Sequence, residues 1–473
     1  MDDDSSSELE GPRGDDLAAA STLMVSHDEA FVNDQIRVKG FNLPANQTVS
    51  VSWRLITGMW GMQRSNKVLG PQYTSQEEEL FRVETDESRE FKRSWTVPES
   101  FGGEHHLELK AGDRTLDTES FTIKPHFELD RQEAPLGESF RLRGYGLGRD
   151  RVSTNYQVTW DNGYVGFMTG VENRGTATAD IRAVGPVGEH VIQVWRNYTG
   201  VPFLQNNTQS PADEITGGRP YVWNVTVTEP DRSPPLAEME SMYDEEPIQE
   251  HIPPVDEESE ASLTIQPTSG KPGTSAILTG RGFPANTEVD LVWHTHGGER
   301  VSDDPVRSEP RPEVLPTTVT DEEGSFQVDI TIPTDIGATR PIFAAVDGRT
   351  IASTGFMLQP DIVDVSPTKG PVGTAITVEL AGLGWPLYEN NYYVLYDNKP
   401  MGYVASNVAE DGIVRFNVRA SGEPGYHFIE VIPTFNNTET DEFDFDHKPH
   451  LSYLDNHPGR AMPGMHFAIE VTE

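Results

Sequence analysis

Short runs in which apolar and polar residues alternate recur along the whole chain. Examples are Val49-Ser-Val-Ser-Trp53, His190-Val-Ile-Gln-Val194, Val289-Asp-Leu-Val-Trp293 and Phe326-Gln-Val-Asp-Ile330. Turn residues such as Asp161-Asn162-Gly163 separate these runs. A period of two punctuated by polar turns is typical of antiparallel strands with one buried face, and no long stretch repeats with the helical period of 3.6. We therefore expect an all-β chain of sandwich domains.

The runs belong to an internal repeat. Pro44-Ala-Asn46 and the following Trp53 match Pro284-Ala-Asn286 and Trp293 at an offset of 240 positions. A second set matches at offsets of 236 and 237. It pairs Asn155, Asp161, Asn162, Arg182, His190 and Val194 with Asn391, Asp397, Asn398, Arg419, His427 and Val431. Repetition at so many separated positions indicates a tandem duplication of two unlike units, A and B.

Each unit has the length of an immunoglobulin-like sandwich, so the repeat predicts four such domains in the order A-B-linker-A-B. Their expected limits are 21–125 (A1), 126–229 (B1), 262–360 (A2) and 361–473 (B2). No spacer separates A from B, and Pro125 or Pro360 lies at the joint, so each A-B pair is expected to be a stiff rod.

The segments outside these units have a different composition. Residues 230–261 contain Pro234-Pro235, Pro253-Pro254 and many acidic residues, which favours an extended, mobile linker between the rods. Residues 1–20 begin Met-Asp-Asp-Asp-Ser-Ser-Ser, and we expect this acidic N-terminus to be disordered.

Two of the four units begin with a recognisable glycine pattern. The third opens with Gln266-Pro-Thr-Ser-Gly-Lys-Pro-Gly-Thr and continues to Gly280-Arg-Gly-Phe283, and the fourth opens with Ser366-Pro-Thr-Lys-Gly-Pro-Val-Gly-Thr. Both resemble the start of IPT/TIG-type immunoglobulin-like domains, the E-set type. The resemblance implies a sandwich fold that serves as spacer, adhesion module or binding platform, and it implies no particular activity.

The composition limits which partners the protein can bind and indicates the salt concentration in which it works. Asp and Glu number 76 against 36 Lys and Arg, only nine of them Lys, and the formal charge is −40. Such a charge disfavours nucleic acid as a partner. In molar salt the Debye length falls to about 3 Å, so closely spaced carboxylates barely repel, and the few lysines indicate a halophilic microorganism. An ordinary acidic, solubilising surface is the alternative.

Two further absences exclude classes of site and location. The chain has no Cys, which excludes disulfides, cysteine nucleophiles and thiolate metal sites. It has no stretch apolar enough for a transmembrane segment, and its first residues do not read as a signal peptide. Tandem sandwiches without Cys favour an extracellular or cell-surface location with the leader removed, and a virion-associated or cytoplasmic location is the alternative.

The histidines read mainly as structural residues. His190 and His427 recur at one place in both B units, where a strand histidine packs or bonds locally, and no catalytic partner is identifiable. Asp161-Asn162 and Asp397-Asn398 are explained as hairpin turns. His294 and His296 share one face of a strand, but neither a third metal ligand nor a repeat of the pair is evident.

The remaining candidates would bind ions or sugars. Asp441, Asp444 and Asp446 alternate with aromatics and offer oxygens to Ca²⁺, but a solvated acidic strand is the favoured explanation, and no other cofactor is expected. Trp60 and Trp385 are expected in loops, where they could stack on glycans. Sequons for glycosylation lie at Asn46, Asn197, Asn206, Asn224 and Asn436.

These observations favour a non-catalytic, extracellular or cell-surface protein in adhesion, scaffolding or display, adapted to high salt. Its partners would be other proteins or surface polysaccharides. A structural subunit of a virion, filament or appendage, which would self-assemble, is the second hypothesis. A polysaccharide-binding or enzyme-accessory module is the third. No grouping of nucleophile, base and oxyanion donors is readable, so we expect no enzyme.

Overall fold

The computed structural model describes residues 20–473 except 64–66, 150–153, 197–200, 203, 205–218, 242–245, 248, 250–251, 256–258, 298–308, 385–390, 407–411, 435–447 and 460–461. The expected disordered segment 1–20 lies almost wholly outside the described residues. In the part that is described, the strands form four two-sheet sandwiches. One helical turn, α1 (Tyr453–Asn456), accompanies them. The predicted all-β, immunoglobulin-like fold is confirmed.

The A domains share one topology, in which a three-stranded sheet faces a larger one. In A1 the sheet orders are β1 (Thr22–Val25)–β3 (Gln35–Phe41)–β6 (Phe91–Thr96) and β2 (Glu29–Ala30)–β8 (Arg114–Ile123)–β7 (Gly103–Ala111)–β4 (Thr48–Gln63)–β5 (Lys67–Glu84). In A2 they are β18 (Ser262–Gln266)–β20 (Ser275–Arg281)–β24 (Phe326–Thr331) and β19 (Ser269–Gly270)–β26 (Arg349–Leu358)–β25 (Ala338–Val346)–β21 (Glu288–Gly297)–β22 (Glu309–Val314), with β23 (Thr318–Val319) also on β21.

The B domains are likewise matched. In B1 the sheet orders are β14 (Ala177–Arg182)–β11 (Ser139–Tyr145)–β9 (His126–Leu129) and β10 (Glu133–Pro135)–β16 (Tyr221–Thr228)–β15 (Gly188–Arg196)–β12 (Tyr156–Trp160)–β13 (Gly163–Met168). In B2 they are β27 (Asp361–Ser366)–β29 (Ala375–Ala381)–β32 (Ile413–Arg419) and β17 (Ala237–Met239)–β34 (Met465–Thr472)–β33 (Gly425–Pro433)–β30 (Asn391–Tyr396)–β31 (Lys399–Ala405), with β28 (Lys369–Pro371) parallel to β34.

The alternating strands bury one face, as their pattern requires. Trp53 and Trp293 occupy the same position in the two A cores and are fully buried. Each satisfies its indole N–H with a carboxylate: Trp53 donates to Glu78 at 2.9 Å and Trp293 donates to Asp335 at 2.8 Å. Full burial of such large rings is a main source of stability in each sandwich.

The two A-B joints are fastened in the same way. The backbone N–H of Gly102 donates to the carbonyl of Leu147 at 3.0 Å, and that of Gly337 donates to the carbonyl of Leu383 at 2.5 Å. Both bonds run from a loop of an A domain to a loop of the following B domain.

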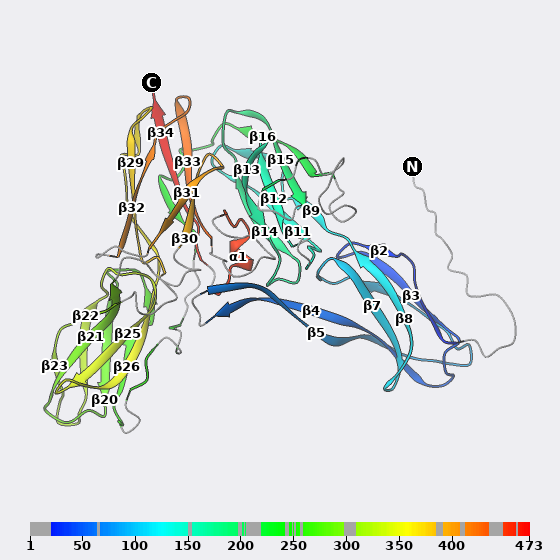
Figure 1. The fold of residues 1–473 in the computed structure, drawn as a ribbon, viewed down its shortest axis with the longest axis horizontal. Helices are drawn as coiled ribbons and strands as arrows, with labels where there is room; N and C mark the ends of the chain where they lie inside the picture. Colours follow the sequence, from blue (N-terminus) through cyan, green and yellow to red (C-terminus); the bar gives the residue numbers. More distant parts are fainter. Residues whose placement is uncertain are drawn as a thin grey trace.

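The expectation of two rods on a mobile hinge is wrong. B1 and B2 lie side by side in the middle of the molecule, with A1 and A2 at opposite ends (Figure 1). The hydrophobic core of B1 is continuous with six side chains from B2, namely Leu395, Phe428, Ile432, Leu451, Tyr453 and Ala468.

The segment expected to be an extended, mobile linker is partly a strand. Its residues Ala237–Met239 form β17, which pairs antiparallel with the edge strand β34 of B2. Pro234 lies against the interface at Gly137, and the side chain of Ile252 lies beside Gly355 of A2. Pairing of the free N–H and C=O groups of an edge strand holds the segment despite its acidic composition.

Candidate interdomain site

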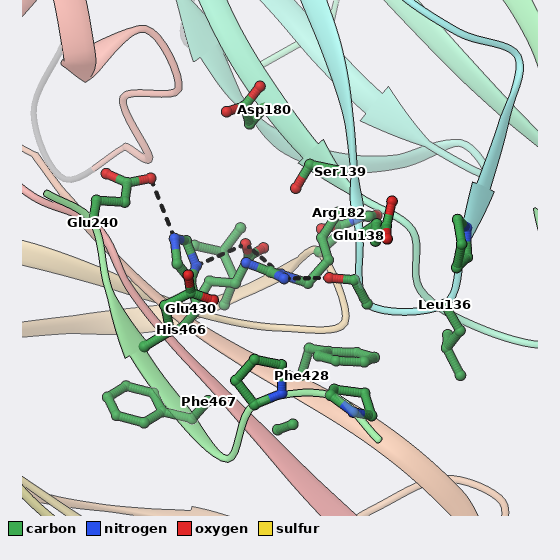
Figure 2. A pocket seen from close by; sticks show the side chains of 18 of the residues that line it. Leu136, Glu138, Ser139, Asp180, Arg182, Glu240, Phe428, Glu430, His466 and Phe467 are labelled. Atoms are coloured by element: carbon green, nitrogen blue, oxygen red, sulfur yellow. Dashed lines mark hydrogen bonds and ion pairs between the residues drawn. The ribbon is translucent and has the colours of Figure 1, made fainter. Parts of the chain in front are cut away.

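Arg182 joins the two B domains. It ends β14 of B1, where its Nη1 donates to the carbonyl of Gly137 in its own domain at 2.5 Å. Its Nε donates to Oε1 of Glu430, on β33 of B2, at 3.1 Å. The side chains of Arg182 and Glu430 are only 12% and 10% exposed, so this is a nearly buried ion pair between domains (Figure 2).

His466 extends this pair to a third segment. The imidazole lies on β34, with Nδ1 3.3 Å from Oε1 of Glu430 and Nε2 3.2 Å from Oε1 of Glu240 (Figure 2). Glu240 directly follows β17 and also accepts bonds from the hydroxyl of Tyr453 at 2.6 Å and the N–H of Gly464 at 2.7 Å. The cluster therefore connects B1, the segment between the repeats, and B2.

The charges in this cluster balance when His466 is protonated. Burial alone would raise the pKa of Glu430, but Arg182 and His466 outweigh it and lower that pKa to about 2. Burial would likewise lower the pKa of His466, but the carboxylates of Glu240 and Glu430 raise it above the ordinary value. Burial opposes ionisation of Glu240, and its bonds to His466, Tyr453 and Gly464 lower its pKa overall. Two cations thus neutralise two anions away from water, which a stable buried cluster requires.

A cavity of about 680 Å³ lies beside this cluster. Its walls come from B1, from Pro230–Glu240 and from B2, and they include Leu136, Asp180, Arg182, Glu238, Phe428 and His466. Its walls combine acidic, basic and apolar side chains and so select no single ligand chemistry.

A second contact adds backbone pairing between the B domains. The N–H of Phe167 donates to the carbonyl of Pro449 at 2.9 Å, and the N–H of Leu451 donates to the carbonyl of Phe167 at 2.8 Å. Ser452 bonds both backbone groups of Thr169 through its hydroxyl, at 2.9 Å each. A short piece of B2 therefore lies along β13, the edge strand of B1.

The expectation that Trp60 stands in an exposed loop is wrong. Trp60 lies in β4, is 4% exposed, and donates its indole N–H to the carbonyl of Asn456 in α1 at 2.8 Å. It packs with Val68, Phe167 and Val171, so the long β4–β5 hairpin of A1 reaches both B domains (Figure 1). The indole therefore offers no open face to a sugar. Trp385 lies outside the described residues.

Each recurring histidine is paired with the aspartate of the recurring turn. Nδ1 of His190 lies 2.6 Å from Oδ2 of Asp161, and Nδ1 of His427 lies 2.6 Å from Oδ2 of Asp397. The Nε2 atoms face the carbonyls of Pro186 and Glu423. The bond to Asp397 raises the pKa of His427 above its ordinary value. Each histidine therefore uses both ring nitrogens to hold a hairpin. In the sequence, this pairing is indicated by the recurrence of the aspartate together with the histidine in both B units.

The structure places few of the predicted ligand and sugar sites. Asn46 is exposed in a turn with φ of 52°, and Asn224 is exposed on β16. Asn197, Asn206, Asn436, Asp441, Asp444 and Asp446 lie outside the described residues. His294 is on β21 with its side chain half-buried. Within the described residues, no three His, Asp or Glu side chains are grouped to hold a metal ion.

The described part of the chain contains no helix long and apolar enough to cross a membrane. No protein-family model matches the sequence, and no curated protein matches it either.

Several solved structures align with the chain at low similarity. A Salmonella α2-macroglobulin shares 11% identity at a TM-score of 0.17, covering 96% of this chain and 32% of that one. An Escherichia coli α2-macroglobulin shares 10% at 0.17, covering 87% and 42%. The Escherichia coli adhesin FdeC shares 12% at 0.16, covering 73% and 98%. The chain thus spans less than half the length of the two macroglobulin chains. TM-scores this low carry no argument, and the fold rests on the strand pairing described above.

Proposed function

We propose that the chain is a non-catalytic, extracellular or cell-surface scaffold that works in adhesion or display in high salt. The observation that carries this proposal is the buried cluster of Arg182, Glu430, His466 and Glu240, which fastens the two repeats together. We call the resulting bent arrangement, with B1 and B2 in the middle and A1 and A2 at its ends, the arch (Figure 1). The cluster's ionic groups serve to join domains, and the A domains at the ends of the arch are left to contact partners (Figure 1). IPT/TIG resemblance and the charge of −40 support the class and the environment.

The test is small-angle scattering on dilute protein at about 0.15 M and about 2–3 M NaCl, since screening is the variable. We expect one rigid, bent particle at high salt. The variants Glu430→Gln and Arg182→Met break the junction, so the maximum dimension of the particle should increase in each of them. A flexible chain of lobes in the wild-type protein at high salt would reject the arch. Turnover of a carbohydrate or peptide by purified protein would reject the non-catalytic class.

A polysaccharide-binding module remains a weaker proposal because Trp60 is buried. It now depends on Trp385, whose exchange for Ala should abolish any signal on an array of glycans.

A further inference from the structure

B1 contacts B2 through one edge of its sandwich. We define the B1 edge as Gly137, Val165, Gly166, Phe167 and Arg182. Its two glycines are crowded, because a Cβ on Gly137 would lie 2.7 Å from the ring of Phe428, and one on Gly166 would lie 2.5 Å from the carbonyl of Pro449. Val165 and Phe167 are 2% and 1% exposed.

The duplication places an equivalent edge on B2. Offsets of 236 and 237 map the B1 edge onto Gly373, Met401, Gly402, Tyr403 and Arg419, which we call the B2 edge. The residues keep their character: two glycines, an apolar side chain, an aromatic ring and an arginine. Arg419 even donates to the carbonyl of Gly373 at 3.0 Å, as Arg182 does to Gly137.

The side chains of the B2 edge, however, are exposed, although strand β31 itself lies near β13 of B1 in the same chain. A Cβ on Gly373 or Gly402 would meet no atom within 4 Å. Met401 is 53% exposed and Tyr403 is 52% exposed, and the neighbouring Val372 is 63% exposed. Leu136 and Val165, the B1 equivalents of Val372 and Met401, both line the junction, so apolar exposure at these matched positions indicates an interaction surface.

The surface of B2 that binds the B1 edge also has an equivalent, which lies on B1. B2 offers the outer face of its larger sheet, where Phe428 packs on Gly137, Glu430 binds Arg182, and Asn398 donates to the carbonyl of Arg182 at 2.8 Å. The same face of B1 carries Val191, Gln193 and Asn162 at these positions. We call these three the B1 face. Asn162 is exposed, and Val191 and Gln193 are half-buried.

A contact between an edge and a face is heterologous, so one copy of each is left unused in every chain. The intrachain junction shows that a B edge and a B face of this sequence fit one another. We propose that the B2 edge docks the B1 face of a second copy of this chain, so that chains associate head to tail. Arg419 would meet Gln193 in place of a glutamate, which makes this contact weaker than the internal one. Repulsion between chains of charge −40 confines it to high salt.

Light scattering across a concentration series in about 2–3 M NaCl tests the proposal. The weight-average mass of the wild-type protein should rise with concentration past that of a dimer. Met401→Asp on the edge and Val191→Glu on the face should each remain monomeric. Met59→Asp is the matched control, because Met59 is 58% exposed but lies on A1. Gln193→Glu, which restores the ionic partner of the arginine, should shift association to lower concentration.

Mixing the two blocked variants decides the geometry. Met401→Asp retains a working face and Val191→Glu retains a working edge, so an equimolar mixture should form a 1:1 dimer that grows no further. Dimers of Val191→Glu alone would show an edge-to-edge contact and overturn the proposal. So would a wild-type protein that stays monomeric throughout, with Gln193→Glu equally monomeric. The arch is tested separately on dilute protein, so failure here leaves that result standing.

Discussion

At the residue scale, Arg182 and Arg419 hold one position in the two B domains but have different surroundings. Arg182 is paired with Glu430 in the nearly buried junction, whereas Arg419 is exposed. Arg182→Met leaves the nearly buried Glu430 with His466 as the remaining cation of the cluster, and removal of one partner of a buried ion pair costs about 3–5 kcal/mol. We expect hydrogen exchange in β33 and β34 to accelerate accordingly. Arg419→Met removes the same backbone bond at the surface and should change stability by about 0.5 kcal/mol or less. Equal effects of the two changes would contradict the role of the junction.

The same cluster predicts how stability depends on pH. The folded-state pKa of His466 is raised, so its contribution is complete below the ordinary value of about 6.5 and is lost as pH rises through the folded value. The pKa of Glu430 is lowered to about 2, so its contribution is complete above about 4.5 and is lost as pH falls toward 2. Both contributions are therefore complete only between about pH 4.5 and 6.5.

Urea unfolding at constant high salt checks this window. The destabilisation caused by His466→Gln should be largest near pH 5–6 and should shrink as pH rises through the raised folded-state pKa of the imidazole, because the wild-type ring then also loses its charge. A difference that does not change with pH would show that His466 contributes packing alone.

At the scale of elements, the β4–β5 hairpin connects A1 to the B domains through its tip. Trp60 is buried there and bonds to Asn456. Trp60→Ala removes that bond and leaves a cavity, at a cost of about 3–5 kcal/mol to this contact. Amides of the hairpin tip and of α1 should then exchange faster together. Met59→Ala, one position away and exposed, should leave both unchanged. Faster exchange in the tip alone would mean that the hairpin does not hold α1.

This hairpin also shows why one contact between domains could not be predicted from the sequence. The loop expected around Trp60 is instead part of the sixteen-residue strand β4, which also contains Gly58 and Gly61. A Cβ on Gly58 would lie 2.3 Å from the carbonyl of Val171, so the glycine lets a strand of A1 approach the backbone of B1. A glycine within a strand often marks such an approach, but only the fold reveals which backbone it meets.

The strands were predictable because each needs only its own alternating residues, whereas the junction needs three distant segments to meet. A partial signal did exist, in positions where matched repeats depart from each other. Glu430 pairs with His466 across β33 and β34, where Gln193 pairs with Val222 across the equivalent strands β15 and β16 of B1, and both departures belong to the junction. Nothing local in residues 230–261 revealed that β17 would pair with β34.

At the scale of the whole molecule, charge opposes an arch that brings four acidic domains together. A net charge of −40 destabilises the compact state in dilute buffer, where the Debye length is about 10 Å. At about 1 M salt that length is about 3 Å, and this repulsion is largely removed. Ion pairs that are exposed, such as Arg141 with Asp180, weaken at the same time. The nearly buried pair of Arg182 and Glu430 is screened much less.

The free energy of unfolding should therefore rise steeply as NaCl increases from about 0.1 M to about 1 M, with junction amides gaining hydrogen-exchange protection over the same range. Sucrose at matched water activity is the control, because it favours compact states without screening charge. If sucrose stabilised the protein as strongly as NaCl, screening would not be the cause. Stability independent of salt would assign the carboxylates to solubility alone. If the free energy of unfolding rises steeply with NaCl but not with sucrose, and does so in Arg182→Met as well, the salt acts by relieving general repulsion between the domains. The junction then contributes a separate part of the stability that does not depend on salt.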